Sequence, residues 1–414
     1  MLYSIGLFLY MLAASPFYLA RVMKGRYRSS IRERLGGQLA PVKGPSVWVH
    51  ACSVGEVEAA QPLMDLIRRG RPASTVILST VTETGHARAE KLYPQTLVRY
   101  LPYDFLSCVK KHLDAAGDLT EFFIMETEIW PNLIAELHRR DIPIFISNGR
   151  ISDRAWPRYE RFAAFFRPVL AMVTAVAARS EVDADRYRFL GAPCVAPVGN
   201  IKYDRTPAPP PADPPSGRLV VFGSTHPGEE EICIGVYRKL QREFPGLRAI
   251  LAPRHIERAL AIATRCEGSL RSEGWGREDI LVLDTHGELA GMYALADAAF
   301  IGGSLAPIGG HNPIEAAIHG VPVLWGPHIE NFREPCAMLL GNGGEQVQDG
   351  RALEDKMRRL LSDPGYRAEE GDKARAVILA NRGAAERNWA FFGLDDRRLE
   401  ERRRLRQSRE TERR

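Results

Sequence analysis

The sequence predicts two α/β domains, each built on a parallel sheet. Its 414 residues, 45% of them hydrophobic, exceed what one ordinary core requires. A stretch over 206–217, TPAPPPADPPSG, separates two halves in which short apolar runs alternate with longer amphipathic stretches. Proline at this density neither pairs in a sheet nor continues a helix, and it forms a semi-rigid extended spacer. We therefore expect one domain over 35–205 and a second over 218–394.

The apolar runs are the expected strands. Continuous runs rich in β-branched residues, alternating with helical patterns, are typical of parallel strands buried on both faces. In the first half they cover 46–51, 75–79, 97–101, 121–125, 142–147, 173–177 and 195–198. In the second half they cover 219–222, 248–251, 280–283, 298–301 and 321–325. Ligands of open α/β sheets bind beyond the carboxyl ends of strands, and the unusual residues of this chain gather there.

The N-terminal segment predicts a membrane anchor over residues 1–22. Residues 5–20 are nearly all apolar, and four basic residues follow within 21–28. A cleaved secretory signal carries its basic residues before the apolar core, where this chain has none. Basic residues after the segment predict that the rest of the chain stays cytoplasmic. The run is short for a spanning helix and contains Pro16, so a helix in the membrane interface is the alternative.

Composition narrows the class of partner and of site. The net charge of +5 is modest, and the tail over 395–414, with nine Arg and four Glu, reads as a solvated tail, so we expect no nucleic-acid partner. Six cysteines stand singly without a CxxC pair, which argues against a disulfide framework and a zinc site. No P-loop occurs. Asp183 and Asp185 form a D-x-D, but its setting reads as a helix start. We expect no metal and no cofactor.

The segment from His50 to Glu56 directly follows the first strand of the main domain. Ser53 and Glu56 have the S-x-x-E spacing of a capping box, in which the glutamate only caps a helix. A carboxylate at this place can instead remove a proton from an acceptor hydroxyl within hydrogen-bond reach. Taken alone, the residues favour the cap. No His–Asp pattern supports Cys52 as a nucleophile, so we expect it to pack.

Three more strand ends in the first half carry polar residues. Glu126 and Glu128 directly follow an apolar strand, where two carboxylates are costly unless they are solvated or paired. The segment 148–152, NGRIS, is expected to form a turn with a helix cap and to offer a contact for an anionic ligand. Lys202 precedes the linker, where it either faces the cleft expected between two domains or is an ordinary exposed loop lysine.

Several strand-end loops in the second half together predict a nucleotide site. They are GSTHPGE at 223–229, APRH at 252–255, HGEL at 286–289, GGSL at 302–305 and GGHNPIE at 309–315. Asn312, Pro313 and Glu315 suit the N-cap, N1 and N3 positions of a helix. A glycine-rich approach to a helix N-terminus is also an anion site. Arg254 and His255 are candidates to flank a phosphate, and Glu315 to bind ribose hydroxyls.

Taken together, these segments make the sequence similar to the Kdo transferases of lipopolysaccharide synthesis. The shared segments run in order over nearly the whole chain: the N-terminal anchor, HACSVGE, METEIWPNLI, NGRIS, GNIKYD, GSTHPGEE, LAPRHIER, GEL and FIGGSLAPIGGHNPIEA. The resemblance implies the GT-B fold, two facing Rossmann-like domains, with an N-terminal membrane anchor helix. It implies CMP-Kdo as donor and a lipid A precursor as acceptor, at the cytoplasmic face of the inner membrane, whose lipids are then a further partner.

The resemblance also assigns roles to residues. Glu56 is implied as the general base, and Glu126 and Lys202 as groups that stabilise the transition state, with Glu128 as a possible substitute for Glu126. Contacts with CMP are implied at Pro253, Arg254, His286, Gly287, Glu288, Asn312, Pro313, Ile314 and Glu315. Family members often carry other residues at Cys52, His286 and Ile314, and the tail after Leu394 is not shared. The implied reaction replaces the CMP phosphate on the anomeric carbon with a sugar hydroxyl and inverts that centre.

Two other functions stay open on the sequence. One is a GT-B enzyme that uses a UDP-sugar. Protection of the purified protein by UDP but not by CMP would support this alternative. The other is a non-catalytic lipid-binding or scaffold protein on this fold, in which Glu56 is a helix cap and not a base. The substitution Glu56→Gln tests this reading, because Kdo transfer at a near wild-type rate would show that Glu56 is only a cap.

Overall fold

The computed structural model describes residues 3, 6–7, 28–212, 217–274 and 279–394. The chain forms two compact units. The first comprises Met1–Arg205 together with Gly383–Arg414, and the second comprises Thr206–Arg382.

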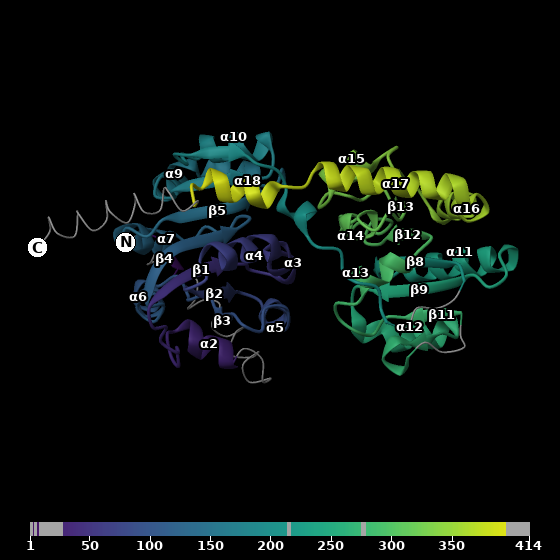
Figure 1. The fold of residues 1–414 in the computed structure, drawn as a ribbon, viewed down its shortest axis with the longest axis horizontal. Coiled ribbons are helices and arrows are strands. Elements are labelled where there is room, and N and C mark those ends of the chain that lie inside the picture. Colours follow the sequence, from purple (N-terminus) through teal and green to yellow (C-terminus); the bar gives the residue numbers. More distant parts are fainter. Residues whose placement is uncertain (1–2, 4–5, 8–27, 213–216, 275–278, 395–414) are drawn as a thin grey trace, which may run out of the picture. The chain divides into compact units, whose positions relative to one another are not determined.

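The first unit contains a seven-stranded parallel sheet with the order β3-β2-β1-β4-β5-β6-β7 (Figure 1). Its strands are β1 (Pro45–His50), β2 (Thr75–Thr80), β3 (Leu97–Tyr100), β4 (Asp118–Met125), β5 (Ile144–Gly149), β6 (Ala175–Ala178) and β7 (Val195–Pro197). The direction in which strands are added reverses between β1 and β4. Such a switch point is where doubly wound sheets bind ligands, beyond the carboxyl ends of the strands.

Helices cover both faces of this sheet. They are α2 (Arg28–Arg34), α3 (Val54–Ala59), α4 (Gln61–Gly70), α5 (Glu83–Leu92), α6 (Leu106–Asp114), α7 (Pro131–Arg139), α8 (Trp156–Arg161), α9 (Ala163–Leu170), α10 (Glu181–Phe189) and the 3-10 turn η1 (Ile201–Asp204). Side chains alternate between the faces of a strand, so Trp48 joins one core cluster while Val47 and Val49 join the other. Burial on both faces explains why the strands read as continuous apolar runs.

The second unit repeats the plan with the strand order β10-β11-β9-β8-β12-β13-β14, again parallel throughout. The strands are β8 (Leu219–Thr225), β9 (Arg248–Pro253), β10 (Ser269–Leu270), β11 (Ile280–Val282), β12 (Ala298–Ile301), β13 (Val323–Trp325) and β14 (Gly344–Gln346). The helices and 3-10 turns are α11 (Glu229–Glu243), η2 (Ile256–Arg258), α12 (Ala259–Cys266), η3 (Arg271–Glu273), α13 (Leu289–Met292), η4 (Tyr293–Leu295), α14 (Ile314–Ala317), α15 (Arg333–Leu339), α16 (Gly350–Ser362) and α17 (Pro364–Ala380).

The last helix that the structure describes, α18 (Ala384–Phe391), belongs to the first unit (Figure 1). Ser147 Oγ on β5 donates to Asn388 Oδ1 at 2.8 Å, and the rings of Phe145 and Phe392 lie 4.7 Å apart. The N–H groups of Gly383 and Ala385 donate to the Asp204 carboxylate. The second domain was predicted to end at residue 394, whereas these contacts join residues 383–394 to the first unit.

The predicted apolar runs all coincide with strands, and only β10 and β14 were not foreseen. The predicted anchor over 1–22 and the tail over 395–414 lie almost entirely outside the described residues. Among the helices that the structure describes, none is both long and apolar enough to cross a bilayer.

Candidate functional site

The polar motifs of the first unit meet at one edge of its sheet. Segments 50–56, 126–130, 148–152, 179–183 and 199–204 follow β1, β4, β5, β6 and β7, which are neighbours in the sheet. Because parallel strands end at the same edge, residues far apart in sequence come together there. This edge includes the switch point between β1 and β4.

Glu56 lies in the first turn of the short helix α3. Its Oε2 accepts the Cys52 backbone N–H at 2.8 Å, and its Oε1 accepts the Ser53 hydroxyl at 3.3 Å. The predicted capping box is therefore incomplete, because Ser53 makes no capping bond to the helix and donates to Glu56 instead. Burial raises the pKa of Glu56 to about 8, and the nearby Glu126 and Glu128 carboxylates add to the rise.

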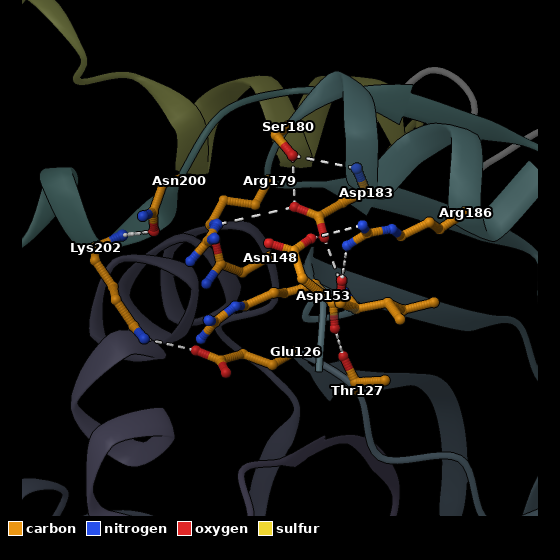
Figure 2. Close-up of polar contacts among 12 residues, drawn as sticks. Glu126, Thr127, Asn148, Asp153, Arg179, Ser180, Asp183, Arg186, Asn200 and Lys202 are labelled. Carbon is orange, nitrogen blue, oxygen red and sulfur yellow. Dashed lines mark hydrogen bonds and ion pairs between the residues drawn. The ribbon is translucent and has the colours of Figure 1, made fainter. Parts of the chain in front are cut away.

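Glu126 and Lys202 form an ion pair across the site (Figure 2). Lys202 Nζ lies 2.7 Å from Glu126 Oε1, and both side chains are mostly buried. Burial opposes ionisation of Glu126, but the charge and hydrogen bond of Lys202, with smaller effects from the charges of Arg150 and Arg179, hold its pKa below the ordinary value. Glu126 is thus a carboxylate while the adjacent Glu56 retains a proton to much higher pH.

The backbone is strained at three strand ends. Glu126 has φ 58°, Asn148 has φ 56° and Ser224, in the second unit, has φ 55°. Left-handed backbone is costly for residues other than glycine and is retained mostly where it aims a functional group. At Glu126 the conformation is stabilised by the Tyr187 hydroxyl, which donates to the Glu126 carbonyl at 3.0 Å.

Glu128 points to a different set of partners from Glu126. Trp130 Nε1 donates to Glu128 Oε2 at 3.1 Å, and His50 Nε2 lies 3.7 Å from the same oxygen. The implied exchange of Glu128 for Glu126 therefore has no support, since it is Glu126 that pairs with Lys202.

The thiol of Cys52 lies among these carboxylates. Burial raises the pKa of this thiol, and the Glu128 and Glu56 carboxylates add to the rise, which agrees with Cys52 as a packing residue rather than a nucleophile.

In the second unit, the GGHNPIE segment turns into the short helix α14. Asn312 Oδ1 accepts the Ile314 N–H at 3.2 Å, and Asn312 Nδ2 donates to Glu315 Oε1 at 3.2 Å. The helix begins one residue later than predicted, with Pro313 at the N-cap. Pro313 and Ile314 are buried, so their side chains are part of the core, whereas Asn312 and Glu315 are partly exposed.

The other residues implied in CMP binding surround the carboxyl ends of β9 and β11. Pro253 ends β9 and is buried, while Arg254 and His255 beside it are exposed. His286 and Gly287 are exposed after β11. Glu288 lies 3.3 Å from an Arg271 guanidinium nitrogen and also accepts the Thr285 hydroxyl. The exposed groups that remain for a ligand are therefore Arg254, His255, His286 and the backbone at Gly287.

The glycine-rich turn after β12 is filled by a carboxylate of the protein itself. Glu229, 1% exposed, accepts five backbone N–H groups, at 2.7–3.1 Å, from His226, Gly303, Ser304, Leu305 and Ala306. These N–H groups would otherwise form an anion-binding nest. The motif GSTHPGE at 223–229 contains Glu229 directly after Gly228, but its spacing did not predict this role.

Two histidines, also unassigned by sequence, lie against the same turn. The Nε2 atoms of His226 and His311 are 2.9 Å apart, and the two rings are stacked. A Cβ on Gly303 would come within 2.8 Å of the His311 ring, so this glycine makes room for the pair. Burial lowers the pKa of His311 to about 3, so at neutral pH the pair holds a hydrogen bond between neutral rings.

No group of three or more His, Cys, Asp or Glu side chains in the described part of the chain has the geometry to hold a metal ion.

Comparison with known proteins decides the family. Residues 29–205 match the profile described as 3-deoxy-D-manno-octulosonic-acid transferase, or kdotransferase. The chain is 33% identical over 401 residues to the 3-deoxy-D-manno-octulosonic acid transferase of Haemophilus influenzae, covering 89% of this chain and 92% of the relative. It is 33% identical over 379 residues to the transferase of the same name from Bordetella pertussis, covering 84% and 86%. The chain belongs to the Kdo transferase family. It is accordingly a glycosyltransferase.

Solved structures place the fold of the Kdo transferase chain in the GT-B class. A UDP-N-acetylglucosamine 2-epimerase matches with a TM-score of 0.59 and 11% identity, over 86% of this chain and 98% of the other. The Neisseria meningitidis UDP-GlcNAc 2-epimerase, bound to UDP-GlcNAc, matches with a TM-score of 0.58 and 11% identity, over 84% and 99%. At this identity the likeness concerns the fold alone, and it confirms the two Rossmann-like sheets predicted from the sequence.

Proposed function

We propose that this Kdo transferase moves Kdo from CMP-Kdo to a hydroxyl of a lipid A precursor, with inversion of the anomeric carbon. The acceptor oxygen attacks that carbon as its bond to the CMP phosphate breaks, and CMP leaves with the bonding electrons. The proton of the acceptor hydroxyl passes to Glu56. Membership of the family supports the sugar that is transferred.

The state of Glu56 is the observation that carries the proposal. A carboxyl with its pKa raised to about 8 is a stronger base than an ordinary glutamate and still has an ionised fraction at neutral pH. The Cys52 N–H and the Ser53 hydroxyl fix the orientation of its two oxygens. A glutamate that served only as a helix cap would need no desolvated environment and no neighbouring carboxylates.

Charged groups on both units suit the other demands of this reaction. The Glu126–Lys202 pair supplies fixed opposite charges on the acceptor-side unit, where charge develops as the glycosidic bond forms. Arg254, exposed after β9, supplies a cation for a leaving phosphate. Asn312 and Glu315 offer polar groups for a ribose.

We further propose that the enzyme works at the cytoplasmic face of the inner membrane. The apolar segment over 5–20 and the basic residues that follow it support an anchor next to an anionic lipid surface. The Tyr3 ring lies 5.8 Å from that of Phe165 on α9, and Phe162 and Phe165 are both exposed aromatic side chains. Recovery of the full-length chain in the inner-membrane fraction tests this location, and recovery in the soluble fraction would contradict it.

The principal test replaces Glu56 by Gln, which keeps its size and removes the base. We expect the folded variant to lose about 100-fold or more of its transfer rate, within the range usual for a general base. Transfer is measured by mass spectrometry of the product formed from CMP-Kdo and a lipid A precursor. Glu58→Gln is the matched control, because Glu58 lies on the same helix but pairs with Arg88 at 2.8 Å. Near wild-type transfer by Glu56→Gln would show that Glu56 is only a cap.

Donor identity is tested by competition. CMP should protect the purified protein against proteolysis or heat, and UDP at the same concentration should not. The reverse result would assign the enzyme to a UDP-sugar and would contradict the proposal.

A further inference from the structure

Tyr3, at the start of the predicted anchor, is docked on the first unit. Its hydroxyl donates a hydrogen bond to the Asp104 carboxylate, and its ring lies 5.8 Å from that of Phe165 on α9. Asp104 is only 3% exposed, and it also accepts the N–H groups of Asn132 and Leu133 at 3.0 and 2.8 Å, in the first turn of α7. Tyr3 therefore contacts a buried carboxylate that is itself part of the folded unit.

Helix α2, which follows the apolar run and its basic residues, is attached to the same loop. The Tyr103 N–H donates to the Arg34 carbonyl at 3.3 Å, and the Arg34 guanidinium lies 5.0 Å from the centroid of the Tyr100 ring. Glu33 accepts the Tyr100 N–H at 2.8 Å through its Oε1. These contacts fix α2 to the end of β3 and to the residue directly before Asp104.

The contacts limit how far apart the two ends of residues 4–27 lie. Tyr3 and Arg34 contact adjacent residues of one loop, so their Cα atoms are at most about 25 Å apart, the combined reach of a tyrosine side chain, one Cα–Cα step and two hydrogen bonds. The seven residues of α2 add about 10 Å to its first residue, Arg28. A single crossing instead places its ends about 40–45 Å apart, on opposite faces of the membrane. Both ends are therefore held on one folded unit, at a separation shorter than a crossing.

The surface next to Tyr3 suits a lipid interface. Phe162 and Phe165 are 52% and 41% exposed, and Arg161 and Arg167 on the same two helices are exposed as well. The Arg161 guanidinium lies 5.8 Å from the centroid of the Phe162 ring. Aromatic rings and arginine side chains are favoured at the level of anionic lipid headgroups. The side of the first unit that holds Tyr3 can therefore meet one leaflet directly.

We propose that Tyr3 stays on Asp104 when the enzyme is at the membrane, so that the chain before α2 enters one leaflet and does not cross the bilayer. The proposal rests on the proposed location and deepens it. The sequence left open whether the anchor spans the bilayer or lies in its interface, and the contacts of Tyr3 favour the second. A crossing would carry Tyr3 to the opposite face and remove its hydroxyl from a buried carboxylate, which is unfavourable.

The first test locates the start of the chain relative to the membrane. Leu2→Cys is combined with Cys194→Ser in the full-length chain, and spheroplasts are treated with a membrane-impermeant maleimide before and after lysis. The wild-type chain, whose Cys194 is exposed on the first unit, is the control for the cytoplasmic side, and Cys194→Ser alone sets the background. We expect labelling above background only after lysis for both chains. Labelling of the Leu2→Cys chain in intact spheroplasts would overturn the proposal. If that chain is labelled in neither state, a protease-cleavable tag before Met1 gives the same distinction.

The second test asks whether Tyr3 is docked in the membrane-bound enzyme. Tyr3 is replaced by the photoreactive analogue p-benzoylphenylalanine, which keeps an aromatic ring, and isolated membranes are irradiated. We expect mass spectrometry to find adducts within residues 103–105 or 162–166. The same analogue at Phe189, an exposed ring on α10 that packs on Trp156 at 5.4 Å, is the matched control and should give no adduct at 103–105. Adducts of the Tyr3 variant with lipid alone would overturn the proposal.

Neither test depends on Kdo transfer. Recovery of the chain in the soluble fraction would contradict the proposed location. Recovery in the membrane with labelling from outside would instead contradict this inference alone. Loss of transfer in any variant leaves both results readable, so failure of the proposed function and failure of this inference are distinguishable.

Discussion

The carboxyl groups of Glu56 and Glu126 lie close together at this site, but their pKa values are shifted in opposite directions. Glu56 is held towards its neutral form by burial and by Glu126 and Glu128, whereas Glu126 is held in its ionised form by Lys202 despite burial. Pairs of carboxyl groups whose environments separate their pKa values in this way are typical of acid–base sites. The sequence motifs named Glu56, Glu126 and Lys202, and the structure brings them together at one sheet edge.

The sequence could not show how these side chains are held. The S-x-x-E spacing predicted a capping box, but the donors to Glu56 are the Cys52 N–H and the Ser53 hydroxyl. The left-handed conformations of Glu126 and Asn148 depend on contacts with residues distant in sequence, such as the Tyr187 hydroxyl, so local propensity gives no sign of them.

The dependence of transfer on pH follows from Glu56. A base must be ionised, so we expect the transfer rate to rise with pH and to level off above about pH 8. Glu128→Gln removes one of the charges that raise the pKa of Glu56, so the midpoint of the rise should move to lower pH. Glu58→Gln, on the same helix, should leave the midpoint in place. A midpoint near pH 4–5 in the wild-type enzyme, the range of an ordinary glutamate, would contradict this account.

The same shift has a consequence for stability. The folded state raises the pKa of Glu56 above its value in the unfolded chain, so the folded state binds the proton more tightly. The contribution of Glu56 to the free energy of unfolding is fully present below about pH 4.5, and it is lost as the pH rises through about 8. Glu56→Gln should therefore be more resistant to heat than the wild type at pH 9 and should differ little at low pH. Differential scanning calorimetry at the two pH values checks this, and equal stability at pH 9 would contradict it.

Among the elements, the long apolar strands were predicted well and the short edge strands were not. β10 and β14 contain two and three residues and lack a continuous apolar run, so their pairing depends on the sheet beside them. The start of α14 was also predicted within one residue, because Asn312 and Pro313 have strong local preferences.

The turn after β12 shows what sequence patterns leave undecided. Residues 302–305 were predicted to belong to a nucleotide site, whereas in the structure the N–H groups of this turn donate to Glu229 of α11. One carboxylate thereby joins the ends of β8 and β12 to the first turn of α11. Which anion fills a nest depends on tertiary packing, which no local spacing reveals.

Glu229→Gln should loosen this turn. The amide –NH2 would face backbone donors, leaving at least one of the five N–H groups unsatisfied, at a cost of about 1–3 kcal/mol for each. Hydrogen exchange of residues 303–306 should rise at least fivefold, the low end of that cost. Glu231→Gln is the matched control, since Glu231 lies two residues further on and forms an exposed pair with Arg265 outside this turn. Equal exchange in the two variants would show that the Glu229 carboxylate does not hold the turn.

At the scale of the whole molecule, the chain passes between its two units twice. It leaves the first unit after Arg205 and returns to it at Gly383. The proline-rich stretch made the first passage visible in the sequence. The second was not visible, because α18 has an apolar face that would suit either sheet, and only its tertiary partners, Ser147, Phe145 and Asp204, decide where it packs.

Asp204 should therefore control the return of the chain. Its carboxylate accepts the N–H groups of Gly383 and Ala385 at the start of α18, and an N-terminal cap of this kind contributes about 1–2 kcal/mol. Asp204→Ala should raise hydrogen exchange over 384–391 about tenfold and leave α16 protected. Asp349 caps α16 by accepting the Ala352 N–H at 2.8 Å, so Asp349→Ala should produce the opposite pattern. The two substitutions remove equivalent caps in different units. If either variant raised hydrogen exchange in both α16 and α18, Asp204 would not be what secures α18 to the first unit.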